Sequence, residues 1–455
     1  MTLEKDPLNI QRVDARNGSA EILDQLRKKL SPQGDVVSPR GRALTEEVFG
    51  EALSPVEVVQ RICRDVAHDG TSALLHYTAA LDKANLTAQQ LRVPADALAQ
   101  AHDAADPKLI DSIRRIRDNV AAFQAAILHQ DTTIEAQTGV RLTQRYVPIR
   151  RVGVCVPGGA AAYPSTVLMT VVPAQVAGVE EIAVVAPPTP FGAYNADMLA
   201  TCHELGVTEV YRAGGAQAVA ALAYGCDAIS AVDKIVGPGN LFVALAKKHV
   251  YGTVDIDSFA GPSEVIVIAD STARPDYVAA DLLAQAEHSP GSAILITWDE
   301  DLIDAVHREL AEQLGSLARN ELTLESLEAF GALILVRDEI HACKLTDEFA
   351  PEHLHIETAN PREQIARIRN SGAAFLGHHT PVALGDYAAG PSHVLPTGGT
   401  CTWAAGLSSN SFLRSGSVTE FTPDALNQIA EDVVRLAEKE GLTAHARSVT
   451  IRTQG

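Results

Sequence analysis

The stretch RVGVCVPGG, at residues 151–159, decides the fold class, because it is a short β-rich run that ends in two glycines and leads into an apolar helical segment at 165–177. The same order of strand, glycine turn and helix returns at EVYRAGG (209–215) and VDKIVGPG (232–239). This repeat is typical of a parallel sheet wrapped by helices. Residues 151–264 are therefore expected to form one α/β unit.

A second α/β unit is expected further along the chain. Its five predicted strands are SEVIVIAD (263–270), SAILITWD (292–299), ALILVRD (332–338), LHIET (354–358) and AAFLG (373–377). Helical segments separate most of these strands, again as in a parallel sheet. The residues before 150 are polar and helix-prone, those from 377 to 422 resemble a loop, and one amphipathic helix is expected at 423–441.

The composition is that of a globular protein with an acidic surface. Of the 455 residues, 46% are hydrophobic and 21% are charged, and the formal net charge is −20. These proportions exclude a disordered chain, and the negative charge argues against nucleic acid as a partner, because such binding uses clustered Lys and Arg. No signal peptide, no membrane-spanning stretch and no CxxC pair is visible among the six cysteines. We expect a reduced, cytoplasmic protein.

Three glycine turns are the first candidate ligand site: Gly158-Gly159, Gly214-Gly215 and Gly237-Pro238-Gly239. Each follows a predicted strand, and ligands of open α/β sheets bind at the carboxyl ends of strands, where helix N-termini attract anions such as a pyrophosphate. The chain has no GxGxxG fingerprint, since Phe242 stands where the nearest match needs its third glycine. Two interpretations stay open, a ligand cradle and simple tight turns.

Two short segments carry side chains suited to metal binding or catalysis. Gln285 and His288 share one face of a predicted helix, although a lone histidine at a helix end is often only a C-terminal cap. Glu352 and His353 place an acid beside a base just before a strand, which suits general acid–base catalysis. The alternative for this pair is an ordinary surface dipeptide.

The last part of the chain adds Asp386, His393 and His445 to these candidates. Such residues on loops serve function more often than residues in the core do. Together with Gln285 and His288 they offer nitrogen and oxygen donors but no thiolate, a set compatible with zinc or manganese.

Eight sequence blocks resemble the histidinol dehydrogenase family, in the family's order and over nearly the whole chain from about residue 35. The blocks are VPGGAAAYPSTVLM (156–169), GGAQAVAALAYG (214–225), VDKIVGPGN (232–240), AGPSEVIVIAD (260–270), DLLAQAEH (281–288), FAPEHL (349–354), LGDYAAGPSHVLPT (384–397) and EGLTAH (440–445).

The resemblance implies a zinc-dependent oxidation of L-histidinol to L-histidine through an enzyme-held L-histidinaldehyde, the last steps of histidine biosynthesis. It implies two NAD⁺ used in succession and one Zn²⁺ per subunit. The implied fold is α/β, with two incomplete Rossmann-like domains that have parallel sheets, small N- and C-terminal extensions, and an intertwined homodimer with shared active sites. The expected divisions are an N-terminal extension (1–34), a first domain with the helical part and the substrate and metal half (35–150 and 265–395), a second, NAD-binding domain (151–264), and a C-terminal extension that contributes to the dimer (396–455).

The family motifs also imply roles for single residues of this chain. Glu352 and His353 look like the catalytic acid–base pair. The implied zinc ligands are Gln285, His288, Asp386 and His445. The implied substrate contacts are these four ligands together with Ser263, His353, His393 and Glu440. The implied NAD contacts are Cys155, Gln217 and Asn240.

Two positions depart from the family pattern, and two other functions compete with the main one. Cys155 stands where the family often has Tyr near the cofactor, and Ser392 stands where Asn is common before the histidine. A relative that oxidises another small alcohol, such as a sulfonated propanediol, is the alternative enzyme, but the acidic Glu440 suits a cationic substrate and repels a sulfonate. A non-catalytic zinc-binding scaffold is the alternative outside enzymes, and the intact Glu352-His353 pair argues against it.

Overall fold

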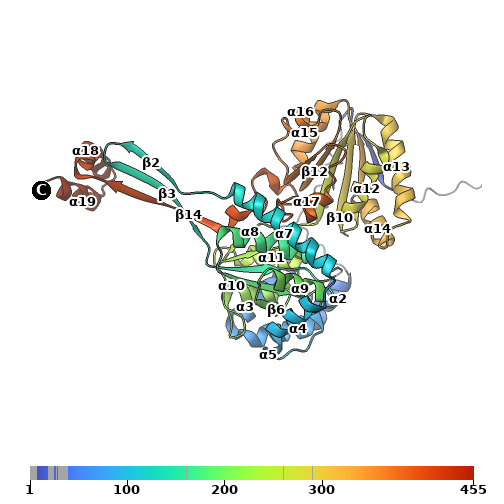
Figure 1. Ribbon diagram of the computed structural model, residues 1–455, viewed down its shortest axis with the longest axis horizontal. Coiled ribbons are helices and arrows are strands. Elements are labelled where there is room, and N and C mark those ends of the chain that lie inside the picture. Colours follow the sequence, from blue (N-terminus) through green and yellow to red (C-terminus); the bar gives the residue numbers. More distant parts are fainter. Residues whose placement is uncertain are drawn as a thin grey trace, which may run out of the picture.

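Two α/β lobes and a projecting arm make up the molecule (Figure 1). The computed structural model describes residues 8–18, 25–26, 28, 39–159, 161–259, 261–288 and 290–454. Each lobe is built on a parallel sheet, and a third, antiparallel sheet forms the arm. The expected α/β class with two parallel sheets is confirmed. None of the helices in the described parts of the chain is long and apolar enough to cross a membrane.

The first lobe contains a five-stranded sheet with the order β6-β5-β4-β7-β8. Its strands are β4 (Arg151–Cys155), β5 (Glu181–Ala186), β6 (Glu209–Arg212), β7 (Lys234–Val236) and β8 (Asp255–Ile256), and its crossover helices are α8 (Pro164–Ala177), α9 (Ala196–Glu204), α10 (Gly215–Tyr224) and α11 (Leu241–Val250). Apolar residues cover both faces of this sheet, so β4 is buried along its whole length. The three glycine turns lie at the carboxyl ends of β4, β6 and β7, as expected.

Within residues 39–127, six helices precede this sheet in the chain and pack onto it. They are α2 (Pro39–Phe49), α3 (Pro55–Asp69), α4 (Thr71–Asp82), α5 (Ala88–Leu91), α6 (Ala95–Ala104) and α7 (Pro107–Ile127). Ser54 caps α3, since its Oγ accepts from the Glu57 backbone N–H at 3.4 Å and Glu57 Oε2 accepts from the Ser54 backbone N–H at 2.9 Å. Helix α3 packs on α10 and α11, α6 on α9, and α7 on α8. These contacts differ from the expected grouping of 35–150 with 265–395, because a polar helical composition does not reveal which sheet the helices cover.

The second lobe contains a six-stranded parallel sheet with the order β1-β11-β10-β9-β12-β13. Its strands are β1 (Gln11–Asp14), β9 (Ser263–Ala269), β10 (Gly291–Thr297), β11 (Ala332–Leu335), β12 (His353–Glu357) and β13 (Ala373–Leu376), and its helices are α12 (Pro275–Ala286), α13 (Glu300–Leu314), α14 (Asn320–Phe330), α15 (Glu339–Phe349), α16 (Pro361–Ile365) and α17 (Ala383–Tyr387). All five strands expected here are present. The sixth, β1, comes from the expected N-terminal extension and pairs with β11 at the sheet edge.

Strand β12 has two chemically different faces. Leu354 and Ile356 pack into the apolar cluster that contains residues of α15, whereas His353, His355 and Glu357 alternate with them and point to the other face. All five side chains are buried. The sheet therefore carries a row of buried ionisable groups on the face that α12 covers, as the contact of His355 with Asp281 of α12 shows.

The arm corrects two expectations about the C-terminal region. It consists of β2 (Thr132–Gln137), β3 (Val140–Pro148) and β14 (Leu413–Phe421), with α18 (Pro423–Lys439) and α19 (Thr443–Thr453) at its far end (Figure 1). Residues 377–422 are thus not entirely loop-like, and two helices rather than one close the chain. Strand β14 exposes nearly every residue, so its sequence lacks the alternation of a half-buried strand.

Candidate active site

The Glu352-His353 pair lies at the amino end of β12, on the side of the second lobe that faces the first. Ser263, the first residue of β9, stands beside it, because His353 pairs with Val265 in the register of the two strands. Both members of the pair are buried. The surface-dipeptide interpretation of this pair is therefore wrong.

Glu352 is held by two hydrogen bonds to one of its oxygens. The Ser263 hydroxyl donates to Glu352 Oε2 at 2.6 Å, and the Glu264 backbone N–H donates to the same atom at 2.9 Å. Burial raises the pKa of Glu352 to about 8, while the two donors oppose that change and the charge of Asp386 adds to it. A carboxyl group whose pKa lies near neutrality can give and take a proton under physiological conditions.

His353 is oriented as a base. Its Nδ1 lies 3.3 Å from the Glu264 carbonyl oxygen. Because a carbonyl oxygen can only accept a hydrogen bond, Nδ1 carries the proton and the lone pair is on Nε2. Nε2 lies 3.8 Å from Asp386 Oδ1. Burial lowers the pKa of His353 below its ordinary value, against the opposing charge of Asp386. The imidazole is therefore neutral near pH 7 and ready to accept a proton at Nε2.

Two of the four expected zinc ligands, His288 and Asp386, lie close to His353, and a third, Gln285, lies three residues before His288. Gln285 of α12 is buried, and its Nε2 has no hydrogen-bond partner among the described residues. His288 follows the end of the same helix, where burial lowers its pKa and the nearby charge of Asp386 opposes that effect. An amide without a partner, an imidazole and a carboxylate in one place fit a zinc ion with nitrogen and oxygen ligands.

His393 supports this group from the side of the loop that follows α17. Its Nδ1–H donates to the Asp386 carbonyl oxygen at 2.9 Å, and its Nε2 lies 3.4 Å from Thr166 Oγ1 on α8. The contact joins the two lobes across a cleft of about 470 Å³, which His288, Asp386 and Tyr163 help to line. Ser392 accompanies it by donating from its hydroxyl to the Met169 carbonyl oxygen at 2.8 Å.

Glu440 and His445 lie far from the other expected site residues of the same chain. Glu440 directly follows α18 and His445 is in α19, at the end of the arm, which Figure 1 shows projecting away from both lobes. Both side chains are exposed. One chain therefore brings together Ser263, Gln285, His288, Glu352, His353, Asp386 and His393, but not the two residues of the arm.

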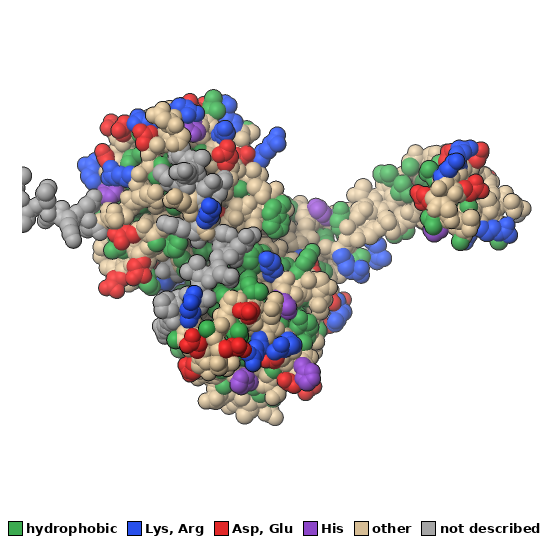
Figure 2. All heavy atoms as spheres, turned by 180° about the vertical axis from the view of Figure 1, so that it is seen from behind, with side chains coloured by type: hydrophobic (Ala, Val, Ile, Leu, Met, Phe, Trp, Pro, Cys, Tyr) green, Lys and Arg blue, Asp and Glu red, His purple; other side chains and the backbone are tan. Residues whose placement is uncertain are grey.

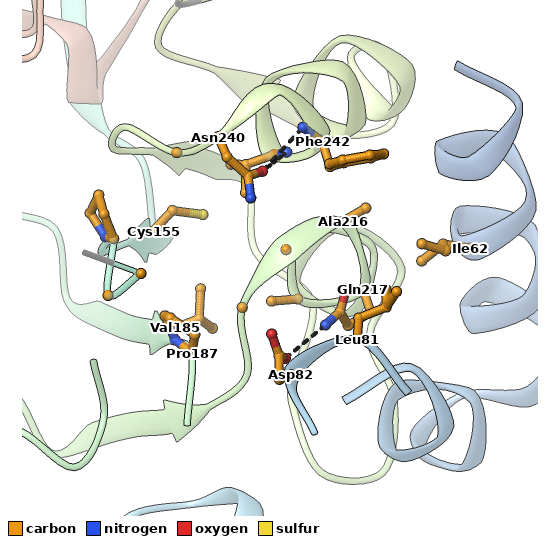
Figure 3. Close-up of a pocket in the computed structure, with 18 of the residues that line it drawn as sticks. Ile62, Leu81, Asp82, Cys155, Val185, Pro187, Ala216, Gln217, Asn240 and Phe242 are labelled. Carbon is orange, nitrogen blue, oxygen red and sulfur yellow. Dashed lines mark hydrogen bonds between the residues drawn. The ribbon is translucent and has the colours of Figure 1, made fainter. Parts of the chain in front are cut away.

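The expected cofactor residues surround a separate cavity of about 370 Å³ at the carboxyl edge of the five-stranded sheet (Figure 3). Cys155, Gln217 and Asn240 all line it, together with the glycine turns. The cradle interpretation of these turns is favoured over simple tight turns. Gly215 adopts a φ of +64°, and a Cβ there would stand 2.7 Å from Gln217 Oε1, so only glycine suits this turn.

The polar side chains of this cavity differ in how many of their hydrogen bonds are already made within the protein. Asn240 Oδ1 accepts from the backbone N–H groups of Phe242 and Val243, both at 3.1 Å, and so caps α11. Gln217 Nε2 donates to Asp82 Oδ2 at 3.0 Å, while the buried Gln217 Oε1 has no partner in the part of the chain that the structure describes. That orphaned acceptor, beside a helix N-terminus, fits a polar ligand such as a dinucleotide. Burial raises the pKa of the Cys155 thiol to about 12, so this residue packs rather than reacts.

Two groups near the site were not expected from the sequence. Glu264 is buried next to Glu352, and burial together with the charge of Glu352 raises its pKa to about 8. Asp281, His355 and Glu357 form a buried cluster on α12 and β12. The alternation of polar and apolar residues in HLHIE (353–357) was the signal for the second group, because a fully buried strand normally carries apolar residues on both faces.

Comparisons with known proteins agree on one family. The chain matches the histidinol dehydrogenase family over residues 50–453. It is 73% identical over 450 residues to the histidinol dehydrogenase of Rhodopirellula baltica, with 98% of each chain covered. It is 46% identical over 406 residues to that of Thermosynechococcus vestitus, covering 89% of this chain and 94% of that protein. The crystal structure of histidinol dehydrogenase from Elizabethkingia anophelis has a TM-score of 0.88 and 32% sequence identity, with 98% of each chain covered.

Proposed function

The chain belongs to the histidinol dehydrogenase family, and from this premise we propose that it oxidises L-histidinol to L-histidine with NAD⁺ at the site around His353. The observation that carries the proposal is the buried Ser263–Glu352–His353 arrangement beside Gln285, His288 and Asp386. Oxidation of a different small alcohol, such as a sulfonated propanediol, is not favoured, since the named relatives at high identity are histidinol dehydrogenases.

His353 supplies the base for both oxidations. Its neutral imidazole, with the lone pair on Nε2, takes the proton from the substrate hydroxyl as the neighbouring carbon loses a hydride. The imidazolium then releases that proton to solvent, and the aldehyde adds water to give a hydrate. In the second oxidation Nε2, again neutral, takes the proton of the hydrate hydroxyl as the second hydride leaves.

Glu352 supplies the base that the second oxidation alone needs. In its ionised form it takes a proton from a water molecule whose oxygen bonds to the aldehyde carbon. The hydroxyl of Ser263 and the backbone N–H of Glu264 stabilise that ionised form. Because the pKa of Glu352 is near 8, the ionised fraction grows as the pH rises through neutrality.

The two non-protein groups would be held at the two places described above. Gln285, His288, Asp386 and His445 would hold Zn²⁺, and the cavity lined by Cys155, Gln217 and Asn240 would hold NAD⁺. When bound, Zn²⁺ supplies a Lewis acid that fixes the substrate amine and imidazole, and NAD⁺ supplies the hydride acceptor.

The arm supports an intertwined homodimer in which each chain completes the other's site. Glu440 and His445 are remote from their own lobes (Figure 1). Figure 2 shows hydrophobic side chains on the arm beside charged ones, and the exposed apolar residues there are Ile134, Val418, Phe421, Ile429, Val433, Leu436, Leu442 and Ile451. A second copy of the chain would cover them and receive Glu440 and His445 as ligands to substrate and metal.

The net charge of −20 and six free cysteines support a small-molecule enzyme of the reducing cytoplasm.

A stoichiometric assay tests the proposed function. Purified protein is incubated with zinc, excess NAD⁺ and a limiting amount of L-histidinol, and NADH is followed by its absorbance. We expect two NADH per histidinol consumed and histidine as the product. One NADH per histidinol, or no reaction with histidinol while an anionic diol is oxidised, would contradict the assignment.

A further inference from the structure

A second cluster of metal-binding side chains lies in the six-stranded lobe, apart from the candidate zinc ligands. Asp281 of α12 and His355 and Glu357 of β12 each place one ligand atom within 4.8 Å of the other two. Their side chains are 8%, 1% and 0% exposed. Buried carboxylates normally need a positive charge or several hydrogen bonds beside them, so the contacts of this cluster decide what it can hold.

His355 is oriented as a metal ligand would be. Its Nε2 lies 3.1 Å from the Gly377 carbonyl oxygen, so Nε2–H donates to that oxygen. The other nitrogen, Nδ1, faces Asp281 Oδ2 at 2.6 Å and Glu357 Oε1 at 3.6 Å. Nδ1 is within hydrogen-bond distance of Asp281 and would give up its proton and that contact when an ion binds. A backbone carbonyl that fixes the other ring nitrogen is the usual support of a metal-bound histidine.

Glu357 lacks hydrogen bonds that would stabilise its carboxylate. Neither of its carboxylate oxygens has a hydrogen-bond partner anywhere in the described ranges of the chain. Oε1 lies 3.6 Å from His355 Nδ1, and Oε2 lies 3.6 Å from Nδ1 of His378. That separation is too long for a hydrogen bond. Two ligands of one tetrahedral ion stand about 3.4 Å apart, because each lies roughly 2.0–2.2 Å from the metal.

We propose that Asp281, His355 and Glu357 bind a second divalent transition-metal ion of the zinc or manganese class. His378, whose Nδ1 lies 3.6 Å from Glu357 Oε2, would turn toward the ion as a fourth ligand. Two imidazoles and two carboxylates match the ligand preference of these ions, and no thiolate is present to select a softer one. The His378 side chain is 29% exposed and gives an entry path from solvent. Asp281 and His355 stand closer than two ligands of one ion do, so their side chains separate when the ion binds.

The position of this site indicates a structural role. His355 is two residues beyond His353 on β12, and Asp281 is one helical turn before Gln285 on α12. An ion between them would join the strand that carries the catalytic base to the helix that carries a candidate zinc ligand. It would touch neither the substrate cleft nor the cofactor cavity, because none of its ligands lines either one. The inference does not depend on which substrate the enzyme oxidises.

Metal counting on the full-length protein tests the proposal. The protein is stripped with a chelator, reloaded with excess Zn²⁺ or Mn²⁺, desalted and analysed for metal per chain by mass spectrometry. We expect two ions in the wild type, one in His288→Ala and one in Glu357→Gln. His307→Gln, which alters a different buried histidine of the same lobe, is the matched control and should keep two ions.

The outcomes separate this proposal from the zinc assignment of the active site. One ion in the wild type, none in His288→Ala and one in Glu357→Gln would overturn the second site. One ion in the wild type and in His288→Ala, but none in Glu357→Gln, would uphold it and refute the active-site assignment instead. If Glu357→Gln does not fold, titration of stripped His288→Ala with Zn²⁺ decides, because a rise in its unfolding temperature and one bound ion are expected only if the second site exists.

Discussion

Replacing Ser263 by alanine should move the pH dependence of aldehyde oxidation. The Ser263 hydroxyl donates to Glu352 Oε2 at 2.6 Å, and this bond helps to lower a pKa that burial has raised to about 8. A hydrogen bond to a charged group is worth about 1.5–3 kcal/mol. Since one pKa unit corresponds to about 1.4 kcal/mol, the ionised fraction of Glu352 at pH 7 should fall roughly 10- to 100-fold.

The assay follows NADH formation from histidinaldehyde in single turnover between pH 6 and 10. For Ser263→Ala the rate at pH 7 should fall by about the same factor as the ionised fraction, and the acidic limb of the profile should move up by about one to two pH units. The rate should recover at high pH, because Glu352 is still present and ionises there. Histidinol oxidation should keep its pH profile, since it depends on His353 instead.

Ser292→Ala is the matched control. Ser292 lies on β10 of the same sheet, where its hydroxyl donates to the Phe330 carbonyl oxygen at 2.7 Å without contacting Glu352. This variant should leave both profiles unchanged. If Ser263→Ala lowers the rate equally at every pH and leaves the acidic limb in place, Ser263 acts only as a substrate contact and the reasoning about the pKa of Glu352 is refuted.

Three further predictions concern the division of roles, the dimer and the metal. Glu352→Gln should slow aldehyde oxidation by about 10²–10⁴-fold while sparing alcohol oxidation, whereas His353→Asn should slow both oxidations. If Glu352→Gln slows both oxidations equally, Glu352 only orients His353. Mixing inactive His445→Ala with inactive His353→Ala under demonstrated subunit exchange should restore activity, because each hybrid dimer owns one intact site, and continued inactivity would disprove the sharing. A strong chelator should abolish activity, and Zn²⁺ or Mn²⁺ should restore it. A variant in which all six cysteines are replaced should behave in the same way, and loss of the metal from this variant would contradict a site made only of nitrogen and oxygen ligands.

The sequence predicted the parallel sheets well because their strands are buried on both faces. Continuous apolar runs such as 263–270 and 292–299 ended at recognisable turns, and each became a strand. Glu352 and His353 were found because they stand together in the chain. The sequence could not show that both are buried, and burial is what raises the pKa of Glu352 and lowers that of His353.

The arm and the second ion cluster were missed for opposite reasons. Strand β14 is exposed along nearly its whole length, so no buried face imposes a pattern on it, and only its pairing with β3 makes it a strand. Asp281 and His355 are about 70 residues apart and meet only because α12 covers the β12 face of the sheet. Contacts between residues so far apart in the chain follow from tertiary packing, which a single sequence without relatives does not specify.

The pairing of β1 with β11 has a consequence for how the protein is made. Residues 11–14 are synthesised about 320 residues before their partner strand. At 5–20 residues per second that interval lasts about 16–64 s. The helices and strands of the five-stranded lobe, from α2 to β8, are encoded in between, although Val394, Leu407 and Phe412 join its core only later. We therefore expect most of this lobe to form during translation while β1 remains unpaired. Strand β1 can pair only once β11 is made, and the six-stranded sheet is complete only after β12 and β13 have followed.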